Sequence, residues 1–155
     1  MFERLTLPLL AALLLWPATA QAQSVPAPVT SQLIYVPAYV SVLTQADRSE
    51  PLAATLVVHN VDPEQNISVT QIDFHDNLGV KLSSHLPAPV ILRPFASTSA
   101  LIPLRSDGGV GANFLVSWNS SDPALPPVVE AIMVGGNGTQ GISFKTSGQV
   151  IRETP

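Results

Sequence analysis

Three closely spaced glycines are the first residues in this sequence whose type and spacing could form a binding or catalytic site. The stretch Asp107–Trp118 reads DGGVGANFLVSW. A phosphate-binding loop needs a lysine after its glycines and a helix behind it, so that a cation and a helix dipole face the anion. Here no lysine follows, Asp107 would repel phosphate, and ANFLVSW is typical of a strand. The pattern predicts a bend in which Gly108, Gly109 and Gly111 supply positive φ or close backbone approach, while Asn113 bonds to the loop backbone.

Glu130 is the second residue that could do chemistry, because it interrupts the apolar stretch Val128–Val134 (VVEAIMV). Every other position on both faces of this predicted strand is apolar, which favours burial on both sides. A buried carboxylate needs a partner, or its pKa rises. A structural role would pair it with loop amides or with Arg93, Arg105 or Arg152. A functional role would make it a general acid or a ligand-binding carboxylate, and we favour the structural role.

The histidines and acidic residues do not form a recognisable catalytic or metal-binding set. No His-x-His or His-x3-His spacing occurs, and a hairpin of the strands that end at His59 and His75 would hold these two apart. The sequence also lacks a Gly-x-Ser-x-Gly elbow, and most carboxylates, including Asp73 and Asp76, fall in apparent turns. We therefore predict no catalytic residue, no metal site, no cofactor and no enzymatic activity.

Composition limits the possible partners. Apolar residues make up 46% of the chain and charged residues 12%, which suits one packed domain. The formal net charge is -4 and no Lys/Arg cluster occurs, so nucleic-acid binding is not expected. Because cysteine is absent, disulfides and thiolate metal sites are excluded.

The N-terminal residues are typical of a secretory signal peptide. Arg4 precedes an apolar run of twelve residues, Leu5–Trp16, which is shorter than the roughly 20 needed to span a bilayer. Small residues allow cleavage after Ala20 or after Ala22. We predict a signal peptide over residues 1–22, a flexible linker over 23–31, a periplasmic or secreted mature protein, and no membrane span after cleavage.

The rest of the chain, residues 32–153, predicts short strands bounded by glycine and proline. This pattern, without a convincing helix, favours an all-β, antiparallel, immunoglobulin-like β-sandwich. The expected strands are Gln32–Val42, Leu52–Asn60, Ile67–His75, Val80–Leu82, Val90–Leu92, Ser97–Pro103, Ala112–Trp118, Val128–Val134, Gly141–Lys145 and Gln149–Arg152.

Three details of these strands are also predicted. The alternation in Ile67–His75 changes phase near Thr70, which indicates a bulge. The last two strands are expected to pair as a hairpin across residues 146–148. Edge strands or breaks are expected near Pro37 and Pro89, because proline cannot donate a ladder hydrogen bond.

Five segments in order carry a family resemblance: YVPAYVSV, VVHNVDPEQNISVTQIDFHDNLG, GGVGANFLVSW, PPVVEAIMVG and TQGISF. Together they resemble a bacterial family of extracytoplasmic proteins, the domain of unknown function DUF3124, from about Ile34 to Ile151. The resemblance implies a β-rich exported domain and assigns no reaction, cofactor or catalytic residue.

The sequence thus favours a non-enzymatic exported module that binds an unknown protein partner or associates with the cell envelope. The alternative is a periplasmic protein that binds a small ligand or metal where the loops 59–66, 107–113 and 135–141 would cluster.

Overall fold

Eleven β-strands and no helix occur in the part of the chain that the structure, a computed structural model, describes: residues 26–137 and 140–154. The predicted signal peptide and residues 23–25 of the predicted linker lie outside these residues, whereas residues 29–31 of that linker belong to the first strand. The strands are β1 Val29–Pro37, β2 Ser41–Gln45, β3 Arg48–His59, β4 Ile67–His75, β5 Lys81–Ser84, β6 Val90–Leu92, β7 Ser97–Ile102, β8 Asn113–Ala124, β9 Val128–Asn137, β10 Gln140–Ser147 and β11 Gln149–Thr154.

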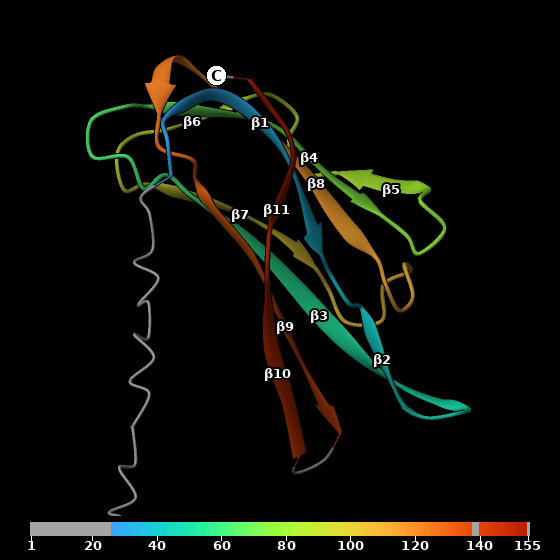
Figure 1. Ribbon diagram of the computed structural model, residues 1–155. Helices are drawn as coiled ribbons and strands as arrows, with labels where there is room; N and C mark the ends of the chain where they lie inside the picture. Colours follow the sequence, from blue (N-terminus) through green and yellow to red (C-terminus); the bar gives the residue numbers. More distant parts are fainter. Residues whose placement is uncertain (1–25, 138–139, 155) are drawn as a thin grey trace, which may run out of the picture.

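These strands form two antiparallel sheets (Figure 1). The first sheet has the order β11-β1-β8-β4-β5, and β6 pairs with the same side of β4 as β5 does. The second sheet has the order β10-β9-β3-β2, and β7 also pairs with β3. The predicted all-β antiparallel architecture is confirmed.

Alternating side chains from both sheets fill one core. In β3, Leu52, Ala54, Leu56 and Val58 are all fully buried, while the residues between them are partly exposed. From the first sheet, β8 contributes Phe114, Val116 and Trp118. The indole Nε1 of Trp118 donates a hydrogen bond of 3.2 Å to Oε1 of Gln32, so the one polar group of this large side chain is satisfied.

The predicted bulge in β4 is present. The register of β4 against β8 shifts between Val69 and Gln71. Because of the shift, Val69 before it and Ile72 and Phe74 after it all point into the core. On the other side of the strand, Gln71 and Asp73 stand next to each other on the outer face.

The predicted C-terminal hairpin is wrong. β10 pairs with β9 in the second sheet, whereas β11 pairs with β1 in the first sheet. The chain changes sheets at Gly148, whose N–H donates a 2.8 Å hydrogen bond to the carbonyl of Val129. The short link between two strands favoured a hairpin, but alternation of side chains does not reveal which strand each one pairs with.

The proline predictions are correct for one segment and partly wrong for the other. Pro37 ends β1, and the chain then enters β2 of the other sheet, so the predicted break is confirmed. β1 itself lies between β11 and β8 and is not an edge strand. Near Pro89, β6 pairs within the described residues only with β4, so it lies at an edge as predicted.

Candidate functional site

A cavity of about 430 Å³ opens where strands at the margins of the two sheets face each other. Its walls come from β5 of the first sheet, from β7 of the second sheet and from the segment 103–107 that follows β7. Among the described residues, β5 pairs only with β4 and β7 only with β3, so both strands have an open edge. The lining residues are Phe74, Leu82, Ser83, His85, Leu101, Ile102, Pro103, Arg105, Ser106 and Asp107.

His85 places a neutral polar ring in this cavity. Its Nε2 lies 2.9 Å from Oγ of Ser83, and its ring packs edge-on against Phe114 with centroids 6.1 Å apart. Burial lowers the pKa of His85, and the negative charge of Asp73 opposes this only in part. Because the ordinary pKa is already near 6.5, the imidazole is uncharged at neutral pH.

Arg105 brings a cation to the cavity wall and sits in an unusual backbone conformation. Its φ is 66°, in the left-handed region that a residue with a side chain rarely adopts. The ion pairs between described residues are Arg48–Glu50, Lys81–Asp73 and Lys145–Glu130, so neither Arg105 nor Asp107 forms one. Residues in such strained backbone conformations are often found at binding sites, and a guanidinium without an ion-pair partner is suited to bind an anion.

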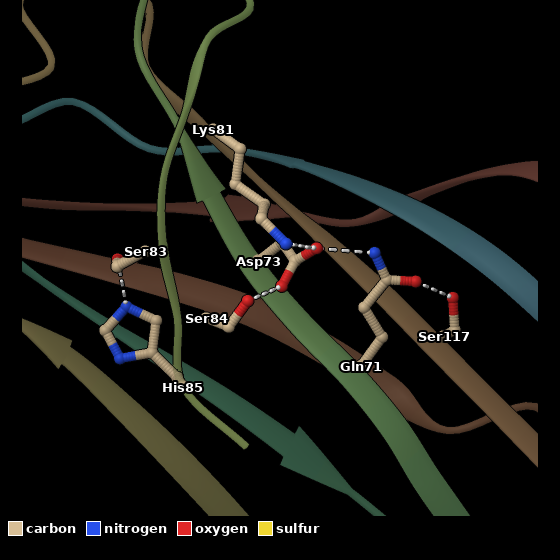
Figure 2. Close-up of polar contacts among 7 residues, drawn as sticks. All are labelled: Gln71, Asp73, Lys81, Ser83, Ser84, His85 and Ser117. Carbon is tan, nitrogen blue, oxygen red and sulfur yellow. Dashed lines mark hydrogen bonds and ion pairs between the residues drawn. The ribbon is translucent and has the colours of Figure 1, made fainter. Parts of the chain in front are cut away.

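Asp73 organises the strand that forms one wall of the cavity (Figure 2). Its carboxylate accepts hydrogen bonds from Ser84 Oγ at 2.6 Å, from Gln71 Nε2 at 2.7 Å and from Lys81 Nζ at 3.2 Å. Burial raises the pKa of Asp73, but these hydrogen bonds and the Lys81 charge outweigh it and hold the pKa below its ordinary value. The charged carboxylate therefore clamps both ends of β5 onto β4.

This role was missed from the sequence, because Asp73 was counted with the solvated carboxylates of the turns although it falls within the predicted strand Ile67–His75. It lies inside β4 and is only 7% exposed. The phase change at Thr70 holds the signal that could have found it, since the shifted alternation puts Gln71 and Asp73 on one face. In Figure 2 the Ser83–His85 contact lies apart from the Asp73 cluster.

The glycine loop borders the cavity through Asp107. Gly108, Gly109 and Gly111 have φ values of 137°, 70° and 97°, so the predicted bend with positive φ is confirmed. A Cβ on Gly108 would lie 3.0 Å from Cζ of Phe74, so a larger residue would require a neighbour to move as well as an unfavourable positive φ. Asn113 opens β8, and within the described residues its side chain makes no hydrogen bond to the loop, contrary to the prediction.

Glu130 lies outside the cavity lining, and the prediction that its strand is buried on both faces is wrong. Val129, Ala131 and Met133 are buried, but Val128, Ile132 and Val134 on the face of Glu130 are 48%, 37% and 45% exposed. Glu130 pairs with Nζ of Lys145 on the neighbouring strand at 2.8 Å instead of with an arginine. This hydrogen bond lowers the pKa of Glu130 despite partial burial. The apolar residues on both faces were misleading, because no part of residues 26–137 and 140–154 covers the outer face of this strand.

The predicted cluster of three loops does not form. Segment 59–66 lies where β3 ends, and Asn60 donates from its N–H to the carbonyl of Ala96. Segment 107–113 lies toward the opposite end of β3, because Gly108 approaches Val40 and Val40 accepts a hydrogen bond from Leu52. β3 and β4 also belong to different sheets, so the hairpin predicted to separate His59 from His75 is absent. In residues 26–137 and 140–154, no group of three His, Cys, Asp or Glu could hold a metal.

Comparison with known proteins identifies the family. The profile described as "Protein of unknown function (DUF3124)" matches residues 31–151, most of the chain. The protein belongs to the DUF3124 family. Among curated proteins, none matches the chain significantly. A solved structure, "Crystal Structure of Thermotoga maritima 1070", superposes with a TM-score of 0.48 at 12% identity, covering 83% of this chain and 98% of that one. The DUF3124 description assigns no activity.

Proposed function

We propose that this DUF3124 protein is an exported, non-enzymatic β-sandwich module that binds a protein partner in the cell envelope. The observation that carries the proposal is an apolar rim, defined here as Leu78, Val80, Leu82, Leu101 and Leu104. These side chains are 81%, 55%, 42%, 56% and 54% exposed, and they lie on the segments that line the cavity or lead into them. Several exposed leucines beside a hollow are typical of a surface that meets a partner.

The open edges of β5 and β7 support the same assignment. Unpaired edge strands present free backbone N–H and C=O groups, which a partner can use to extend a sheet. Lys81 is engaged with Asp73 on the outer face, so the β5 edge has little charge to oppose pairing. The partner would therefore contact the protein through this edge and the apolar rim together.

Strand pairing supports the immunoglobulin-like interpretation in part. In immunoglobulin domains the second and fifth strands pair in one sheet and the third and sixth in the other. The pairs β3–β7 and β4–β8 correspond to these four strands. The first and last flanking strands are exchanged between the two sheets relative to an immunoglobulin domain, because β1 lies beside β8 and β9 lies beside β3.

Export is the second part of the proposal and has a direct test. If residues 1–22 form a signal peptide, protein recovered from the periplasm or medium begins at Gln21 or Gln23. Intact-mass and N-terminal peptide spectrometry measure this. Protein that retains Met1 and stays in the cytosol would contradict export.

Partner binding is tested by co-purification from the native cell envelope. Leu104→Glu places a charge in the apolar rim, whereas Ile151→Glu places one at a matched position on β11, since the two side chains are 54% and 57% exposed. We expect a specific partner to co-purify with wild type and with the Ile151→Glu variant and to be lost with the Leu104→Glu variant. Equal recovery with both folded variants would contradict binding through the rim.

A second candidate function is binding of a free small molecule in the cavity. The volume and the mixture of an apolar floor with His85, Arg105 and Asp107 favour it, because ligand pockets combine these features. Native mass spectrometry of untagged protein from the periplasm distinguishes the two functions. A bound small molecule or metal at one per chain would favour the second.

A further inference from the structure

We propose that the cavity holds the free C-terminal residue of an extended peptide, with an apolar side chain inside and its carboxylate on Arg105. The inference deepens the proposed function, on which it rests, because it names the chemistry of the partner. Three features of the cavity carry it: its floor, its unpaired cation and its two open strand edges.

The floor of the cavity suits one apolar side chain. Phe74 and Ile102 are 2% and 4% exposed and belong to the core, while Leu82 and Leu101 stand more openly beside them. The volume of about 430 Å³ falls near the lower end of the roughly 300–1,000 Å³ usual for ligand sites. The space therefore fits one or two residues of a chain and is too small for a folded element.

The charges on the cavity wall favour a single carboxylate. Arg105 presents a guanidinium with no ion-pair partner among the described residues, and a planar guanidinium binds a carboxylate through two parallel hydrogen bonds. His85 is uncharged at neutral pH, and the charge of Asp73 is already neutralised by Lys81. Asp107, on the same wall, would repel a second negative charge in the ligand.

The open edges favour a peptide over a free fatty acid or another isolated carboxylate. Leu82 and Ser83 belong to β5, and Leu101 and Ile102 belong to β7, so the cavity is flanked by two strands whose outer backbone groups are unpaired within the described part of the chain. An extended peptide can pair with either edge while its last side chain enters the cavity. A ligand without a backbone cannot use these groups.

The test compares two peptides that differ only in the C-terminal group, which is a free carboxylate in one and an amide in the other. Titration calorimetry and amide NMR shifts are measured with acetyl-Thr-Val-Ser-Leu bearing a free carboxylate and with the same peptide as its C-terminal amide. We expect the free carboxylate to bind and to shift amide signals of residues 82–85 and 101–107, and the amide to bind about tenfold more weakly or worse. Equal binding of the two peptides, or no binding of the carboxylate form, would overturn the inference.

Variants of the protein provide the matched control. Arg105→Gln should reproduce the loss seen with the amide peptide, whereas Arg93→Gln, at an exposed arginine outside the cavity lining, should bind as wild type does. Equal weakening by both variants would also overturn the inference, because the effect would then be one of net charge.

A third arm separates failure of this inference from failure of the proposed function. Decanoate carries the same charge and an apolar chain but no peptide backbone. If decanoate binds and the peptide does not, the inference and the protein-binding proposal both give way to the small-ligand function. If neither binds while partner recovery still depends on Leu104, only the C-terminal recognition is wrong.

Discussion

Asp62 shows how much one buried carboxylate can hold together. It is 6% exposed, and it accepts backbone hydrogen bonds of 2.8 Å from Glu64, Gln65 and Leu125. The first two fix its own loop, and the third ties that loop to Leu125, which directly follows the end of β8. From the sequence, nearly every carboxylate was assigned to a solvated turn. A position in a turn does not by itself reveal whether backbone donors from distant segments converge on the carboxylate.

Loss of the Asp62 carboxylate should destabilise the fold. The Asp62→Ala variant leaves three backbone N–H groups without their acceptor, and we expect the free energy of unfolding to fall by about 2 kcal/mol. Urea denaturation measures it. Asp122→Ala, at an exposed position, should change the free energy by less than about 0.5 kcal/mol. Equal effects of the two substitutions would show that the three bonds contribute nothing specific.

The same residue predicts a dependence of stability on pH. Its hydrogen bonds hold the pKa of Asp62 below its ordinary value, and burial opposes them only weakly. Its contribution is therefore complete above the unfolded-state pKa of about 4 and is lost as the pH falls toward the folded-state pKa. Between about pH 6 and pH 3, wild type should lose more free energy of unfolding than Asp62→Asn does. Parallel curves from urea unfolding at several pH values would contradict this assignment.

Glu130 should matter little for stability or function. Its partner Lys145 is largely exposed, and pairs of this kind contribute at most about 1 kcal/mol. We expect Glu130→Gln to fold with nearly unchanged stability and to retain the cellular function of the protein. A variant that folds normally and loses that function would return Glu130 to the catalytic or ligand-binding role that its sequence position also allowed.

The positions of the strands could be predicted well from the sequence, but which strands pair with one another could not. Ile67–His75 and Val90–Leu92 have the observed bounds of β4 and β6, because alternation and flanking prolines are local signals. Gln32–Val42 proved to be two strands in different sheets, and the last two strands separate between the sheets. Pairing depends on contacts between residues far apart in the chain, and alternation carries no record of them.

Gly148 should be essential to the change of sheet between β10 and β11. A Cβ there would lie 2.6 Å from Cγ2 of Ile34 and 3.2 Å from the carbonyl oxygen of Val129. We expect Gly148→Ala to lower the midpoint of thermal unfolding, because β1 or β9 must shift to admit the methyl group.

Gly141 is the matched control for this substitution. It lies in β10, and a Cβ there would meet nothing within 4 Å. Gly141→Ala should leave the midpoint unchanged or raise it slightly, since alanine is the less flexible residue. A Gly148→Ala variant as stable as Gly141→Ala would mean that the sheets do not approach closely at this crossing.

The cavity is a property of the whole molecule and has no direct signal in the sequence. β5 is separate in the chain from β7 and the segment 103–107 that follows it, and they meet only because the two sheets stack. Arg105 was considered only as a possible partner of Glu130. The glycines were assigned correctly to a bend, but their neighbours Phe74 and Val40 follow from the tertiary structure alone.

Photo-cross-linking in living cells tests the central claim most directly, namely that the protein binds its partner at the apolar rim and the open edges of β5 and β7. The photoreactive residue p-benzoylphenylalanine replaces Leu104 in one strain and Ile151 in another, at positions of similar exposure. The account predicts a cross-link to one envelope protein from position 104 and none from position 151. A partner captured only from position 151, or none from position 104 in correctly exported protein, would contradict it.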